Sequence, residues 1–173
     1  ELANRWTDGF DGFVHSIGWA PRESISGSFL EGASREGFLS AMNVSVYSYI
    51  AMAKRMVPLM AGHKASLLTL SYLGGEKVVP NYNTMGLCKA ALESATRYIA
   101  ADVGPQGIRA NTLSCGPIKT SPSRSLVSID EVGNTAAFLL SDNSLGITAE
   151  TIYIDGGFNA LACCVDQAAS ENA

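Results

Sequence analysis

The sequence predicts an α/β fold, in which a Rossmann-like, doubly wound parallel sheet forms the middle of three layers and helices cover both faces. Short apolar runs of buried-strand length alternate along the chain with longer segments of helical periodicity. The connections between them are short, which is typical of consecutive strand–helix–strand units with parallel strands. The 173 residues, 47% apolar and 16% charged, fit a single soluble domain spanning 1–173.

The first half of the chain predicts two strands with a long helix between them. The run FDGFVHSIG (10–18) closes on Gly18, and ASLLTLSYLGG (65–75) closes on a pair of glycines. Between them, residues 34–60 place apolar side chains at helical spacing, and Ser34 is suited to be the N-cap of that helix.

The second half continues the alternation. A helix is expected from the region of Tyr82 to about Val103, where Gly104 and Pro105 end it, and IRANTLSCGP follows as a third strand. Ser128 with Glu131 three residues later forms a capping box, so a further helix begins there. The run ETIYIDGGF is the expected fourth strand.

Composition excludes several classes of partner. A net charge of −4 with no cluster of Lys or Arg argues against nucleic acid and against an anionic membrane surface. No apolar run approaches the roughly 18 residues of a membrane span, and the first residues lack the pattern of a signal peptide. Four cysteines without a CxxC pair indicate reduced thiols, no metal site and a cytoplasmic location. We expect His15 to be a hydrogen-bonded core residue.

The segment NYNTMGLCKAALE carries the most informative spacing in the chain. Tyr82 precedes Lys89 by seven residues, or two helical turns, so both should project from nearly one face, roughly 10 Å apart along the axis. A lysine charge makes a phenol easier to deprotonate, which suits a general acid. Spacing alone leaves the alternative that Tyr82 packs in the core and Lys89 is solvated.

The carboxyl ends of the predicted strands gather the remaining candidates. Ligands of doubly wound sheets bind beyond these ends. Three short segments follow successive strands there and should converge on one crevice: Ser16-Ile17-Gly18, Ser71-Tyr72-Leu73 and Gly116-Pro117-Ile118.

Six blocks of the sequence are informative together: HSIGWAP, LTLSYLG, VPNYNTMGLCKAALE, IRANTLSCGPIKT, EVGNTAAFLLSD and IYIDGGF. In this order they resemble the bacterial enoyl-acyl-carrier-protein reductases, which are NADH-dependent members of the short-chain dehydrogenase/reductase superfamily. The resemblance covers nearly all of residues 8–160. Ordinary superfamily members use Tyr-x3-Lys, whereas this branch uses the longer spacing seen here. Gly86 stands where the ordinary lysine would be.

The resemblance implies reduction of the trans-2 double bond of enoyl thioesters carried on acyl carrier protein, in fatty acid biosynthesis, with NADH or possibly NADPH. It also implies a homo-oligomer, a tetramer. Tyr82 matches the tyrosine that hydrogen-bonds the thioester carbonyl, and Lys89 the lysine that holds the nicotinamide ribose. Tyr72 matches a second active-site tyrosine, which could otherwise only cover the core, and Ala20 a substrate contact. The matched cofactor contacts are Ser16, Ile17, Gly18, Ile118, Lys119 and Thr120.

The chain departs from the family pattern in two places. The glycine-rich first strand, turn and helix of the family are not in it, because Gly74-Gly75 and Gly156-Gly157 lack GxGxxG spacing and read as turn glycines. The chain therefore corresponds to the carboxyl-terminal portion of such a reductase. After GPIKT only SPSRSLV stands where the family has a longer segment over the substrate, and we favour an omitted mobile lid over a true deletion. The alternatives are a short-chain dehydrogenase acting on a carbonyl or alcohol, and a non-catalytic remnant that packs against sister subunits.

Overall fold

A computed structural model describes residues 2–5, 7–118 and 127–160, and within these ranges it contains one parallel sheet of four strands in the order β1-β2-β3-β4. The three neighbouring pairs are all parallel. The predicted α/β class with a parallel sheet is therefore confirmed. The strands are β1 (Gly12–His15), β2 (Ser66–Ser71), β3 (Arg109–Cys115) and β4 (Thr151–Ile154).

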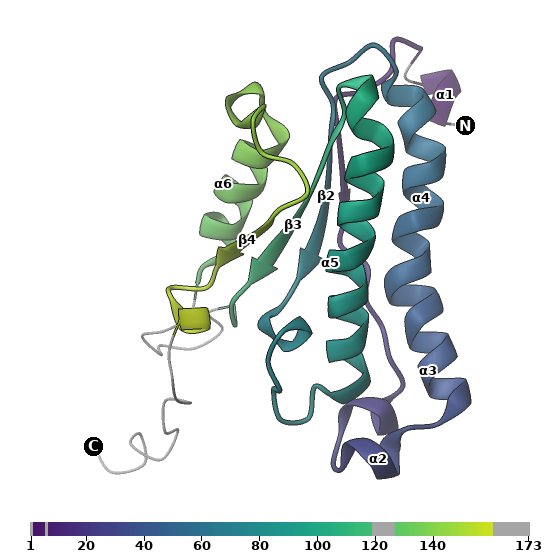
Figure 1. The fold of residues 1–173 in the computed structure, drawn as a ribbon, viewed down its shortest axis with the longest axis vertical. Coiled ribbons are helices and arrows are strands. Elements are labelled where there is room, and N and C mark those ends of the chain that lie inside the picture. Colours follow the sequence, from purple (N-terminus) through teal and green to yellow (C-terminus); the bar gives the residue numbers. More distant parts are fainter. Residues whose placement is uncertain (1, 6, 119–126, 161–173) are drawn as a thin grey trace.

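Helices lie on both faces of this sheet, as Figure 1 shows. On one side stand α5 (Asn83–Val103) and a long helical stretch made of α3 (Arg35–Met42), a π-helical segment (Asn43–Tyr47) and α4 (Ser48–Met56). On the other side stands α6 (Ile129–Leu140). The short helices are α1 (Leu2–Arg5), α2 (Phe29–Gly32) and 3-10 turns at Arg22–Ile25, Val57–Met60, Leu73–Gly75, Gly104–Gln106, Asp142–Ser144 and Phe158–Ala160.

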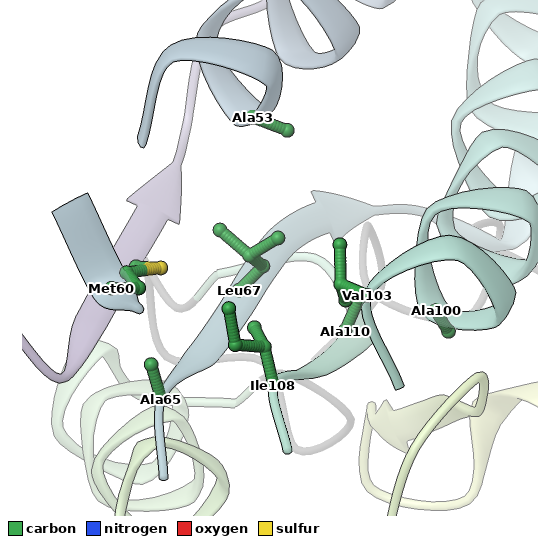
Figure 2. Packing of buried hydrophobic residues seen from close by; sticks show 8 residues of the cluster. All are labelled: Ala53, Met60, Ala65, Leu67, Ala100, Val103, Ile108 and Ala110. Atoms are coloured by element: carbon green, nitrogen blue, oxygen red, sulfur yellow. The ribbon is translucent and has the colours of Figure 1, made fainter. Parts of the chain in front are cut away.

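Side-chain alternation along β2 divides the core between the two faces. Leu67 belongs to the cluster under α4 and α5, and its neighbour Leu68 belongs to a second cluster with Leu113 and Leu139 under α6. Figure 2 shows the first cluster, formed by Ala53, Met60, Ala65, Leu67, Ala100, Val103, Ile108 and Ala110. The central strands β2 and β3 are buried on both faces, as is usual in parallel sheets that helices cover on both sides.

Both predicted N-caps are present. The Ser34 hydroxyl accepts a hydrogen bond from the backbone N–H of Gly37 at 3.0 Å. Ser128 and Glu131 form the reciprocal capping box that begins α6. The helix predicted over 34–60 differs in being interrupted, since it widens into a π-helix at Asn43–Tyr47 and tightens into a 3-10 turn around Pro58.

Some sequence predictions fall on residues outside the described ranges. These are the cofactor contacts Lys119 and Thr120, residues 121–126 of the shortened segment after them, and two of the four cysteines, Cys163 and Cys164. Among the described helices, none is long and apolar enough to cross a membrane.

Candidate active site

Tyr82 stands immediately before α5, held between two asparagines in left-handed conformations. Asn81 has a φ of 62° and Asn83 a φ of 40°, a region that Asn tolerates better than most residues. The Asn81 side chain accepts a hydrogen bond from the backbone N–H of Gly27, and the Asn83 amide donates to the Gly27 carbonyl at 3.2 Å. Tyr82 therefore occupies the N-cap position of α5 in a helical backbone conformation, so it opens the helix that carries Lys89, as expected from the sequence.

Tyr72 and Tyr82 are brought together at the carboxyl end of β2. Their rings pack edge to face with centroids 4.9 Å apart. Gly74 makes room for this arrangement, because a Cβ there would lie 2.3 Å from Cδ1 of Tyr82. Gly74 and Gly75 are thus more than the turn glycines expected from the sequence.

Lys89 and Tyr82 open onto one pocket of about 280 Å³, lined by Gly18, Ile25, Asn81, Tyr82, Met85 and Lys89. The Lys89 ammonium donates a hydrogen bond to the Leu70 carbonyl at 2.8 Å. An ammonium has three donors, so this bond fixes its direction while the others can serve a ligand. The structure brings together Gly18, Tyr82 and Lys89, with Tyr72 touching Tyr82.

Burial, rather than the lysine charge, governs the acidity of Tyr82. Desolvation raises the pKa of Tyr82, and the neighbouring Tyr72 and Cys88 push it in the same direction. Lys89 is not among the groups that shift the pKa of Tyr82 here, so its expected effect on the phenolic proton stays a prediction. A phenol with a raised pKa keeps its proton, so Tyr82 is a hydrogen-bond donor. Burial also lowers the pKa of Lys89.

The π-helical segment holds the loop that follows β1. The buried Ser45 hydroxyl accepts from the Trp19 N–H and donates to the Trp19 carbonyl, both at 2.8 Å. Ser48, directly after the segment, lies 2.8 Å from Nε2 of His15, whose Nδ1 lies 3.1 Å from the Thr69 hydroxyl. His15 is thus a buried, hydrogen-bonded core residue, as predicted. Sequence reasoning did not single out Ser45 or Ser48, because π-helical insertions leave no periodicity of their own.

The remaining predicted contacts among the described residues, Ser16, Ile17, Ala20 and Ile118, do not line this pocket. Ser16 and Ile17 are exposed on the loop that leads to Gly18. Ala20 is buried in an apolar cluster with Met85, against which Tyr82 packs. Ile118 is 41% exposed, forms an isolated β-bridge with Val127, and does not line the pocket. These roles remain predictions.

A second hollow, of about 540 Å³, lies at the amino ends of the strands. Its lining contains none of the predicted site residues: it consists of Asp11, Lys64, Leu140, Ser141 and Asp142. Within the described ranges, no group of three or more His, Cys, Asp or Glu residues is placed to hold a metal ion.

A parallel sheet that brings Tyr82 and Lys89 to one pocket at its carboxyl edge is the arrangement that the resemblance to the short-chain dehydrogenase/reductases implies. The sequence matches the family described as enoyl-(acyl carrier protein) reductase over residues 1–126 and 120–159. The chain belongs to this enoyl-acyl-carrier-protein reductase family.

Two curated relatives illustrate the similarity. The NADH-dependent enoyl-acyl-carrier-protein reductase FabI of Neisseria meningitidis serogroup B is 49% identical over 183 residues, covering 94% of this chain and 70% of the relative. The enzyme of the same name from Escherichia coli K12 is 46% identical, covering 94% of this chain and 68% of the relative. An alignment of 183 positions exceeds the 173 residues of this chain, so the Neisseria protein has residues that have no counterpart here.

Solved structures agree with this assignment. The crystal structure of the NADH-dependent reductase from Aquifex aeolicus superposes with a TM-score of 0.88 at 45% identity, covering 94% of this chain and 67% of that one. The reductase from Anaplasma phagocytophilum, solved in complex with NAD, superposes with a TM-score of 0.86 at 36% identity, covering 95% and 69%. Both identities are high enough that the shared fold extends to shared family membership.

Proposed function

We propose that this protein reduces the carbon–carbon double bond of trans-2-enoyl thioesters carried on acyl carrier protein, using NADH, in fatty acid biosynthesis. Its family membership supports this function. The observation that carries it within the chain is the joint presence of Tyr82 and Lys89 at one pocket, with Tyr72 packed on Tyr82.

The pocket suits the nicotinamide–ribose end of the cofactor. Gly18 opens onto free space, since a Cβ built there would meet no atom within 4 Å. The Lys89 ammonium supplies donors that match the hydroxyls of a ribose, and its bond to the Leu70 carbonyl holds it at the pocket. Lys89 would hold the ribose, and the loop carrying Ser16, Ile17 and Gly18 would lie along the same end.

The chemistry that bound NADH would supply is hydride transfer to the carbon β to the thioester, which would push negative charge onto the thioester carbonyl oxygen. Tyr82 would donate its phenolic hydrogen bond to that oxygen and stabilise the enolate as it forms. Its raised pKa keeps the donor proton in place until it is needed. Tyr72, packed on the Tyr82 ring, would restrict that ring and border the acyl chain, and Ala20 would border the substrate from the loop after β1.

An assay with crotonyl thioester tests this function. The full-length protein should oxidise NADH in its presence and yield the saturated thioester, and parallel titration with NADPH shows which nucleotide is preferred. A short-chain dehydrogenase specific for carbonyls would leave the conjugated double bond intact. A non-catalytic subunit-packing protein would neither bind NADH nor oxidise it.

We also propose a homo-oligomer, a tetramer by resemblance. Apolar side chains exposed on the outer surfaces of the helices support association of copies. These residues include Phe38, Leu39, Tyr47, Ile50 and Tyr98. Light scattering of the full-length protein tests the proposal, and a monodisperse monomer at micromolar concentration would contradict it.

A further inference from the structure

Glu93 is a buried acid that the chemistry described so far does not use. It lies on α5 one helical turn after Lys89, and only 7% of its surface is exposed. Carboxyl groups are rarely buried unless a partner satisfies them. Its position behind Lys89 therefore calls for an explanation.

The partner of Glu93 is the last residue of β2. The Ser71 hydroxyl donates a hydrogen bond to Oε1 of Glu93 at 2.5 Å, and both residues are buried. The preceding residue, Leu70, accepts the hydrogen bond from the Lys89 ammonium. Two adjacent residues at the end of β2 are thus hydrogen-bonded to two residues that lie one turn apart on α5.

Close packing makes this junction tight. A Cβ at Gly75 would lie 3.0 Å from both Oε1 of Glu93 and the backbone nitrogen of Ala90. The loop after β2 therefore packs directly against α5, and steric contact prevents the end of β2 from approaching α5 more closely. Tyr72 follows Ser71 in the chain, so the same junction sets where the Tyr72 ring meets Tyr82.

We infer that Glu93 is a positioning residue, which accepts the Ser71 hydrogen bond and so fixes the end of β2 against α5. The fixed strand end places the Leu70 carbonyl that orients the Lys89 ammonium, and it places the Tyr72 ring against Tyr82. This inference rests on the proposed function, since it concerns the alignment of that same site.

Hydrogen-bond acceptance by Glu93 does not depend on a negative charge. Burial raises the pKa of Glu93 and the charge of Glu76 raises it further, whereas Ser71, Arg97 and Lys89 oppose the shift. An amide oxygen can accept the Ser71 hydrogen bond as well as a carboxyl oxygen can. Glu93→Gln should therefore preserve the junction, while Glu93→Ala should release it.

Three variants of the full-length protein separate positioning from general stability. With crotonyl thioester and NADH, Glu93→Ala should lower kcat/KM about tenfold or more, with a rise in the KM for NADH, because a misplaced ammonium binds ribose poorly. Glu93→Gln should recover most of that loss. Thr96→Val is the matched control, because Thr96 is buried on the same helix and hydrogen-bonds Leu92 and Thr112 instead of β2. It should lower the melting temperature without changing the KM for NADH.

How firmly Lys89 is held can also be measured without any catalytic turnover. Acetic anhydride acetylates a lysine when its ammonium hydrogen bonds are broken, and mass spectrometry measures the acetylation rate at Lys89. Glu93→Ala should raise the modification rate of Lys89 about fivefold, because losing one buried hydrogen bond makes local opening of this junction more frequent by about that factor. Thr96→Val should leave the modification rate of Lys89 unchanged. If wild type lacks reductase activity but this pattern holds, the proposed function fails and the positioning role stands.

Two results would overturn the inference. One is a Glu93→Ala protein whose Lys89 modification and KM for NADH both match those of wild type. The other is a Glu93→Gln protein as impaired as Glu93→Ala, because the negative charge, rather than hydrogen-bond acceptance, would then be the property that matters.

Discussion

At the scale of single residues, the environment of Tyr82 decides its chemistry. A half-buried phenol packed edge to face on Tyr72 keeps its proton, because the phenolate would be poorly solvated there. The role open to such a group is to donate a hydrogen bond to charge that develops in the pocket. Lys89 complements it with the ammonium donors that it presents to the same pocket.

Replacing Tyr82 with Phe keeps the ring and deletes the donor. Loss of one donor to a developing oxyanion in a water-poor site costs roughly 3 kcal/mol, so kcat for crotonyl thioester reduction should fall about a hundredfold. Steady-state kinetics with NADH in excess measures this fall. Tyr72→Phe should cost less, and a larger loss from Tyr72→Phe would mean that the proton donor has been assigned to the wrong tyrosine.

Replacing Lys89 with Met removes the ammonium but retains much of the apolar stem. The KM for NADH should rise and kcat/KM should fall by about two orders of magnitude, since cofactor binding and alignment both depend on this group. Lys64→Met serves as the control, because Lys64 is exposed at the opposite end of the sheet. Equal KM values for NADH in wild type and Lys89→Met would exclude Lys89 from cofactor binding.

At the scale of elements, the π-helical segment Asn43–Tyr47 shapes the pocket from a distance. Ser45 in this segment hydrogen-bonds the Trp19 backbone, and Ser48 directly after it hydrogen-bonds His15, so the loop after β1 and the end of β1 itself are each tied to the helix. π-helical insertions often occur near functional sites for this reason. The loop that carries Ser16, Ile17 and Gly18 thus depends on a helix remote in sequence.

Ser45→Ala tests this dependence. Both hydrogen bonds between the Ser45 hydroxyl and the Trp19 backbone are lost, which should destabilise the protein by about 2 kcal/mol. The KM for NADH should rise severalfold while kcat changes little. Thermal denaturation and kinetics measure the two effects, with Ser40→Ala on α3 as the control. A normal KM in a destabilised Ser45→Ala protein would show that the loop does not contact the cofactor.

At the scale of the whole molecule, two histidines give stability opposite dependences on pH. Burial lowers the pKa of His15, and Lys89 lowers it further, so the stability present above pH 6.5 is lost as the pH falls. The hydrogen bond that His63 donates to the Asp11 carboxylate raises the pKa of His63, and its hydrogen bond to the Asp8 carbonyl raises it further, so the stability present below pH 6.5 is lost as the pH rises. The two dependences partly offset each other.

The variant His63→Gln should expose the contribution of His15. Its melting temperature should fall more steeply than that of wild type when the pH is lowered from about 7.5 to about 5.5, since the stabilising imidazolium is gone. Scanning calorimetry across that range measures the slope. Asp11→Asn should shift the slope in the same direction, and identical slopes in wild type and both variants would contradict this account.

By itself the sequence determined the order of strands and helices, the two caps, and the segments that gather at the carboxyl edge of the sheet. These features follow from short-range causes, since periodicity, capping residues and strand alternation are properties of neighbouring residues. The family blocks added Tyr82 and Lys89 as a pair. Tertiary structure alone decided that Ser71 meets Glu93, that Ser45 holds Trp19, and that burial raises the pKa of Tyr82. The two contacts join residues 22 and 26 positions apart, and the pKa shift depends on desolvation. Both are set by how the helices pack on the sheet rather than by any local pattern.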